Sequence, residues 1–124
     1  MQSKRVLIID DEETIQIVVQ FGIKMAAGWE VLVAGSGSQG IETAQAKKPD
    51  VILLDVMMPE MDGIATFREL QSRVETKHIP VILLTAKAQA SETRQFNELG
   101  VGGVITKPFN ALNLPDQIAR ILHW

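Results

Sequence analysis

Short runs of apolar residues recur along the chain, and polar residues follow them directly. The runs cover residues 6–9, 51–54, 81–84 and 103–105, and the polar residues after them are Asp10 and Asp11, Asp55, Thr85, and Thr106 with Lys107. Continuous apolar runs of this kind are typical of strands that are buried on both faces of a parallel sheet. Because parallel strands end at the same edge of a sheet, we expect these polar side chains to meet at that edge.

Helical patterns lie between the runs, together with a further short apolar run at residues 31–33. Apolar residues repeat at helical spacing at Ile15, Val18, Val19 and Ile23, at Ile41 and Ala44, at Ile64, Phe67 and Leu70, at Phe96 and Leu99, and at Leu114, Ile118, Ile121 and Leu122. The residues expected to begin or cap these helices are Ser38, Asp62 with Gly63, Ser91 and Asn113. Asn113 is preferred to Asn110 as a cap because Pro115 fits only the first turn of a helix.

The alternation of five strands with five helices predicts an α/β fold, with a parallel sheet and right-handed crossovers. Residues 1–124 are expected to form a single domain, because this length suits one hydrophobic core. In doubly wound sheets, ligands bind outside the carboxyl ends of the strands. The polar strand ends therefore lie where a binding site is expected.

Composition excludes several classes of function. The chain has 46% hydrophobic and 22% charged residues, and its net charge of −3 argues against a general nucleic-acid binder. It contains no cysteine, which excludes a disulfide scaffold and thiolate metal sites. The apolar run at residues 6–9 is too short for a signal-peptide core or a membrane span. We expect a cytoplasmic protein that contacts neither membrane nor nucleic acid directly.

The charges at the strand ends indicate a hard cation. Asp10, Asp11 and Asp55 would bring three carboxylates together, and such groups cannot all stay ionised without compensating charge. Lys107 supplies one positive charge, and a divalent cation would supply the rest. Ligand sets made only of oxygen suit Mg²⁺, or Mn²⁺ in its place.

Thr85 and Lys107 add a hydroxyl group and an ammonium group beside this predicted metal site. Such groups bind the oxygens of a phosphoryl group, whose transfer depends mainly on positioning and on neutralising charge. The chain has no glycine-rich loop of the GxxxxGK type, so a nucleoside triphosphate is not the expected ligand. A carboxylate can instead be the nucleophile, and Asp55 is the best candidate because it ends a predicted central strand.

Four motifs, at residues 6–11, 54–63, 84–86 and 106–109, are the most specific features of the sequence. Residues 54–63 read Leu-Asp-Val-Met-Met-Pro-Glu-Met-Asp-Gly, and residues 106–109 read Thr-Lys-Pro-Phe. In these motifs the chain resembles the receiver domain of two-component response regulators, the family that includes the chemotaxis response regulator. The resemblance covers essentially the whole chain. It implies a flavodoxin-like fold with the strand order 2-1-3-4-5.

The resemblance also implies a role for each matching residue. Asp55 would accept a phosphoryl group from a phosphohistidine of a sensor kinase or phosphotransfer protein. Mg²⁺ would be held by Asp11 directly, by Asp10 largely through water, by Asp55 and by the main-chain carbonyl of Met57. Thr85 would hydrogen-bond the phosphoryl group and Lys107 would pair with it. The Lys107–Pro108 peptide bond would be cis, as in other receivers.

The expected output is a protein contact. The chain ends at Trp124, directly after the last predicted helix, so no output domain is expected. Signalling would then proceed through an unknown downstream protein, through relay of the phosphoryl group to another histidine, or through a phosphorylation-dependent homodimer.

One position departs from the family pattern. Receivers usually carry Tyr or Phe three residues before the conserved lysine, and this chain has Val104 there. A valine side chain has a single stiff torsion and cannot reproduce the swing of a ring. Two interpretations remain open: the loops after Thr85 and Lys107 carry the response through backbone shifts, or the response is weak.

Two alternative functions follow from the same residues. A phosphohydrolase with an aspartyl-phosphate intermediate needs an acid two residues after the nucleophile, where this chain has Met57. A receiver fold retained as a scaffold without phosphorylation is the other alternative, and Val104 keeps it open. We therefore expect a signalling domain that acts on its own Asp55 and is not an enzyme toward other substrates.

Overall fold

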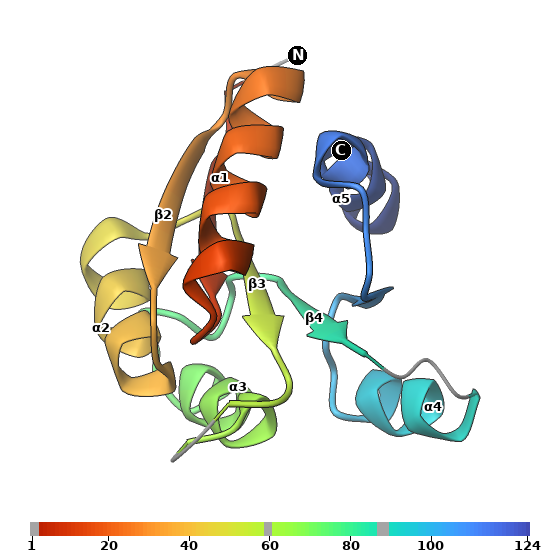
Figure 1. Ribbon diagram of the computed structural model, residues 1–124. Helices are drawn as coiled ribbons and strands as arrows, with labels where there is room; N and C mark the ends of the chain where they lie inside the picture. The colour runs from red at the N-terminus through yellow and green to blue at the C-terminus, as the bar shows by residue number, and fades with distance from the viewer. Residues whose placement is uncertain (1–2, 59–60, 87–89) are drawn as a thin grey trace.

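Strands and helices alternate strictly along the chain (Figure 1). The computed structural model describes residues 3–58, 61–86 and 90–124, and only the backbone of residues 90–93. Strands β1 to β5 cover Arg5–Ile9, Glu30–Ala34, Val51–Asp55, Val81–Thr85 and Gly103–Thr106. Helices α1 to α5 cover Glu13–Ala27, Gly37–Lys47, Gly63–Gln71, Ala90–Glu98 and Leu114–Leu122, and a 3₁₀ turn, η1, covers Ala111–Asn113.

The strands form one parallel sheet in the order β2-β1-β3-β4-β5, which confirms the predicted α/β fold and strand order. Ile9 pairs with Leu54, so Asp10 and Asp55, which follow them, end neighbouring strands at the same level. Asp55 pairs with Leu84, and Thr85 pairs with Thr106. The register therefore places all the predicted site residues along one edge of the sheet.

Helices cover both faces of the sheet, and each face has its own hydrophobic core. Leu7, Ile9, Ile52 and Leu54 point to the face covered by α2, α3 and α4, while Val6, Ile8, Val51 and Leu53 point to the face covered by α1 and α5 (Figure 1). Every residue of β3 and β4 is buried, which explains why the central strands read as unbroken apolar runs.

The start of α2 differs from the sequence prediction. Ser36, and not Ser38, is the N-cap, and its hydroxyl oxygen accepts a hydrogen bond from the backbone N–H of Gln39 at 3.2 Å. The helix therefore begins at Gly37, which lies against Thr66 and Met61 in a space too small for a larger side chain. Ser38 is left exposed in the first turn.

The start of α5 corrects a second prediction. The side chain of Asn113 forms no capping bond, whereas the side chain of Asn110 accepts a hydrogen bond from the backbone N–H of Leu112 at 3.0 Å. The turn η1 continues directly into α5, so the capped start lies one turn before Pro115. At α4, the helix begins at Ala90, one residue before the predicted cap Ser91, whose side chain lies outside the described residues.

Other predicted features are confirmed. The Asp62 carboxylate caps α3 by accepting a hydrogen bond from the N–H of Ala65 at 2.8 Å. The Lys107–Pro108 bond is cis. Within the described ranges, no helix has the length and apolar character needed to cross a membrane.

Candidate functional site

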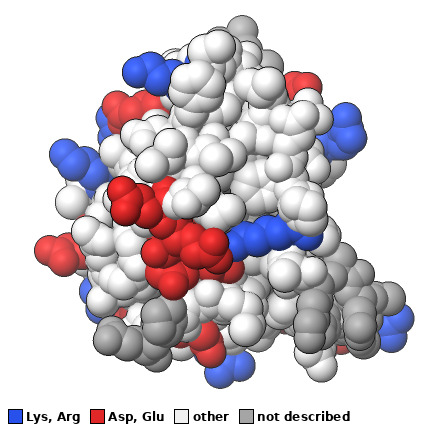
Figure 2. All heavy atoms as spheres, viewed as in Figure 1, with Lys and Arg blue, Asp and Glu red and all other residues white. Residues whose placement is uncertain are grey.

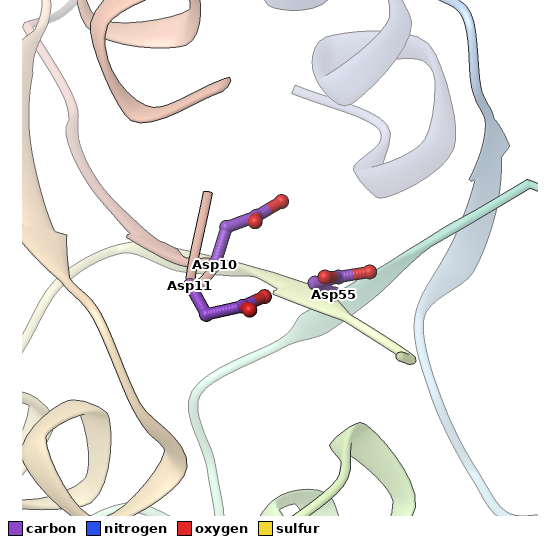
Figure 3. A group of neighbouring side chains, drawn as sticks. All are labelled: Asp10, Asp11 and Asp55. Carbon is purple, nitrogen blue, oxygen red and sulfur yellow. The ribbon is translucent and has the colours of Figure 1, made fainter. Parts of the chain in front are cut away.

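Three carboxylates meet at the carboxyl edge of the sheet. Asp10 and Asp11 follow β1, Asp55 ends β3, and each offers an oxygen that lies within 4.8 Å of the others. Figure 3 shows the side chains of Asp10 and Asp11 extending toward the side of the sheet on which Asp55 lies. Asp10 and Asp55 are buried, whereas Asp11 is exposed, so the group opens to solvent on one side.

Lys107 places its ammonium group between the two buried carboxylates. Its Nζ lies 3.2 Å from Oδ2 of Asp10 and 3.3 Å from Oδ1 of Asp55. The loop that carries Lys107 is tied to β4, because the backbone N–H of Lys107 donates to the carbonyl of Thr85 at 2.7 Å. In Figure 2 a concentrated acidic patch lies near the middle of this face, with basic side-chain atoms against it.

Backbone groups hold the carboxylates in place. Oδ1 of Asp10 accepts a hydrogen bond from the N–H of Glu12 at 2.9 Å, and Oδ1 of Asp55 accepts one from the N–H of Met57 at 3.2 Å. Each acid therefore fixes the turn that leaves its own strand. Gln16, which the sequence interpretation missed, donates from Nε2 to the main-chain carbonyl of Asp10 at 2.6 Å.

Gly63 is a second residue that the sequence interpretation missed as part of the site. Sequence alone assigned it, with Asp62, to a turn and cap. A Cβ atom at Gly63 would overlap the main-chain carbonyl of Asp55 and the Cα of Val56, so α3 starts in direct contact with the end of β3. Its N–H donates to the carbonyl of Val56 at 3.0 Å. Glycine is therefore required at this close approach, and the motif's Asp-Gly pair was the available signal.

Burial and the neighbouring charges shift two pKa values. Burial raises the pKa of Asp55, and the nearby Asp10 carboxylate raises it further, against the opposing effects of Lys107 and the Met57 N–H. Burial alone would lower the pKa of Lys107, but attraction to Asp10 and Asp55 outweighs it and raises that pKa. The site therefore holds more negative charge than the lysine can offset, which is the environment that a cation would relieve.

The remaining predicted residues lie at the same edge. Thr85 is buried at the end of β4, the strand next to Asp55. Met57 is 76% exposed, and its backbone N–H donates to the Asp55 carboxylate. Val104 on β5 pairs with Leu83 and packs, half-buried, against the core that Phe96 and Leu99 also contact.

Known proteins match this sequence and fold over nearly the whole chain. The model of the response regulator receiver domain family matches residues 6–119. The alkaline phosphatase synthesis transcriptional regulatory protein PhoP of Bacillus subtilis is 34% identical over 120 residues, which are 97% of this chain and 49% of that protein. The phosphate regulon transcriptional regulatory protein PhoB of Pseudomonas aeruginosa is 38% identical over 122 residues, which are 98% of this chain and 53% of that protein.

The solved structures agree with the sequence matches. The chemotaxis response regulator CheY4 of Vibrio cholerae superposes with a TM-score of 0.89 at 30% identity, covering 98% of this chain and 100% of that one. The chain thus spans about half the length of the two curated relatives.

Proposed function

The chain belongs to the response regulator receiver domain family, whose model matches residues 6–119, and we propose that Asp55 is its phosphoacceptor. Receiver domains interact with histidine kinases or phosphotransfer proteins, so the proposed donor is a phosphohistidine on such a protein. The observation that carries the proposal is the convergence of Asp55 with Asp10, Asp11 and Lys107 at one edge of the sheet.

The proposed step is a displacement at phosphorus. An oxygen of the Asp55 carboxylate forms a bond to phosphorus while the bond from phosphorus to the donor's imidazole nitrogen breaks. The imidazole nitrogen leaves with the bonding electron pair, the ring becomes neutral by taking a proton from water, and Asp55 becomes an acyl phosphate. Oδ1 of Asp55 is held by the Met57 N–H and Lys107, and this orientation lowers the cost of bringing the reacting atoms into line.

The donor atoms support a magnesium site. Three carboxylates within 4.8 Å, with no nitrogen or sulfur ligand among them, suit a hard divalent cation, and receiver domains bind Mg²⁺ in their acidic site. Asp10, Asp11 and Asp55, with the main-chain carbonyl of Met57, would hold the ion. Bound Mg²⁺ would neutralise charge on the phosphoryl oxygens. Use of Mn²⁺ in place of Mg²⁺ stays a prediction.

Lys107 and Thr85 are proposed to bind the transferred group. The Lys107 ammonium lies 3.3 Å from Oδ1 of Asp55, so a phosphoryl group on Asp55 would meet a cation. Thr85 ends the strand next to Asp55 and would offer its hydroxyl to a phosphoryl oxygen. A link from this contact to Val104 and the output surface stays a prediction, as do the absence of an output domain, the downstream protein and the phosphorylation-dependent homodimer.

Intact mass tests the phosphoacceptor. Treatment with acetyl phosphate and Mg²⁺ should add one phosphoryl group to the wild-type chain, and hydroxylamine should remove it because acyl phosphates react with that reagent. Asp55→Asn should give no adduct. Asp62→Asn is the matched control, because Asn can replace Asp as the cap of α3, and it should be labelled like the wild type. An adduct that survives in Asp55→Asn would refute the assignment.

The phosphohydrolase alternative is tested in the same preparation. The residue two positions after Asp55 is Met57, whose exposed thioether cannot protonate a leaving group. We expect no catalytic turnover of p-nitrophenyl phosphate. Multiple turnovers that are lost in Asp55→Asn would favour the enzyme instead.

A further inference from the structure

The outer face of α1 carries a stripe of large apolar side chains. Ile17, Phe21 and Met25 follow one another at four-residue intervals and are 58%, 66% and 66% exposed. Val18 and, on the adjoining turn η1, Leu112 are also exposed. We call these five residues the α1 stripe. Single exposed apolar residues are ordinary, but several in a row along one helix mark an interaction surface.

The stripe is not the face by which α1 joins the fold. The buried residues of α1 are Val19, Gly22 and Ile23. Gly22 lies so close to η1 that a Cβ atom there would overlap Ala111, which fixes that side of the helix against the turn. The helix is therefore apolar on two sides, and the core accounts for only one of them.

One acidic and one basic residue lie beside the stripe, so that two copies of the helix can place opposite charges against each other. Glu13 and Lys24 are both exposed and lie about three helical turns apart, so they project from nearly the same side of α1. When two helices pair antiparallel about a twofold axis, each flank meets the same flank of the other copy. Glu13 of one copy then faces Lys24 of the other, twice over, and this register brings Phe21 level with Gln16 and next to Ile17 of the second copy.

The opposite flank is apolar. Val18, four residues before Gly22, lies on the same side of α1 as Gly22 and lines a hollow with Lys107 and Phe109. Gly22 itself lies against Ala111 of η1, the turn that also carries Leu112. In the same antiparallel pair this flank also meets itself, so apolar surface is covered by apolar surface. Figure 2, in the view of Figure 1, shows a broad area without charged side chains running from the acidic patch over the side on which α1 lies.

We infer that the α1 stripe pairs with the α1 stripe of a second copy of this chain, with the two helices antiparallel. The inference goes beyond the proposed function and does not depend on it, because the stripe includes none of the proposed site residues, although Val18 lines one hollow with Lys107. The contact rests on one helix and one turn, so it is small, and we expect a dissociation constant on the order of 10 to 100 µM.

Sedimentation equilibrium between about 5 µM and 1 mM protein tests the surface, with the concentration range chosen to bracket that affinity. The wild type should shift from monomer to dimer. Phe21→Lys should weaken dimerisation by at least about 100-fold, because the dimer loses two buried rings and gains two lysines. Val74→Lys is the matched control, since Val74 is 73% exposed and lies after α3, away from the stripe. A monomeric wild type, or a Phe21→Lys variant that dimerises normally, would overturn the inference.

Charge exchange tests the antiparallel register. Glu13→Lys and Lys24→Glu should each weaken dimerisation by roughly 10-fold, since two attractive pairs become repulsive. Mixing the two single variants, or combining both changes in one chain, should restore it. Glu42→Lys, on α2, changes charge equally and should have no effect. If the stripe serves the phosphodonor protein instead, self-association will be absent and the charge exchange will rescue nothing.

Phosphorylation separates this inference from the proposed function. Asp55→Asn should dimerise as the wild type does, although it cannot be phosphorylated. Loss of dimerisation in Asp55→Asn would overturn the α1 pairing as stated, whereas failed labelling of Asp55 with intact dimerisation would refute only the phosphoacceptor.

Discussion

The carboxyl edge of the sheet and the outer face of α1 depart from ordinary folding rules in opposite ways. At the sheet edge, Asp10 and Asp55 are 0% and 3% exposed, so charged groups are buried. On α1, Phe21 and Met25 are each 66% exposed, so large apolar groups face water. Burying charge and exposing apolar surface both reduce stability, and proteins tend to break such local rules where they function.

The difference between the two regions lies in how tightly each is coupled to the fold. The buried carboxylates depend on Lys107 and on backbone N–H groups, so a change in one member affects the others. The α1 stripe has no such partners within the described structure, and a change there should leave the folded domain nearly unaffected. A cation or a phosphoryl group would change the charge balance at the sheet edge. A second protein surface would bury the apolar side chains of the α1 stripe.

The largest change in the free energy of unfolding is expected when Lys107, at the sheet edge, is replaced. Lys107→Met leaves Asp10 and Asp55 without their counter-charge, which should lower the free energy of unfolding by about 3 kcal/mol in the absence of metal. Urea unfolding measures this change. The loss should shrink when Mg²⁺ is added, because a cation would replace the missing charge. Lys77→Met, at an exposed position, is the control, and an equal loss there would contradict the comparison.

Without metal, Asp55→Asn should raise the free energy of unfolding, and by less than Lys107→Met lowers it. Burial and Asp10 raise the pKa of Asp55, so the folded state holds a proton more tightly than the unfolded state does. Wild-type stability should therefore fall as pH rises from about 3.9, the unfolded value, through the raised folded value. Asn removes this dependence and keeps an acceptor for the Met57 N–H.

Above that interval, Asp55→Asn should be more stable than the wild type by on the order of 1 kcal/mol. The advantage should disappear as pH falls toward the unfolded value. Urea unfolding at a series of pH values in a chelating buffer measures both trends. Identical pH profiles for the two proteins would show that the surroundings of Asp55 do not raise its pKa.

The smallest effect is expected on the α1 stripe. Phe21→Ala should change the stability of the dilute monomer by less than about 0.5 kcal/mol, as surface substitutions usually do. Phe67→Ala is the matched comparison, because Phe67 on α3 is only 2% exposed and its truncation should cost about 3 to 5 kcal/mol. Thermal or urea unfolding at low protein concentration compares them. A loss above about 1 kcal/mol for Phe21→Ala would place that ring in the folding core.

Much of the fold and of the site could be predicted from the sequence, because strong local patterns encoded them. Residues 51–54 and 81–84 are short, unbroken apolar runs that are typical of buried strands. Matching such runs gives the register of β1 with β3, in which Val6 pairs with Val51, but not that of β3 with β4, which is shifted by one residue so that Ile52 pairs with Val81. The residues after the strands therefore met as predicted. Asp10, Asp11 and Asp55 converge because strand ends in a parallel sheet share one edge.

Caps were predicted less well, because neighbouring residues compete for them. Ser36 and Ser38 have the same hydroxyl chemistry, and only the structure shows that Ser36 accepts the capping bond from Gln39. Asn110 replaced Asn113 because a turn of 3₁₀ helix precedes α5. The role of Gly63 was hidden for a similar reason, since the contact it permits is with the main chain of Asp55, on a different element.

The sequence by itself determined the α/β fold, a parallel sheet between two layers of helices, and the residues of the sheet edge, since each depends on a periodic pattern or on a position relative to a strand. Only the tertiary structure decided which side of α1 faces the core. Ile15, Val18, Val19 and Ile23 share a helical repeat, yet Val19 and Ile23 are buried while Val18 is exposed. A helix with apolar residues on two sides has no preferred face of its own, and the approach of η1 to Gly22 selects one.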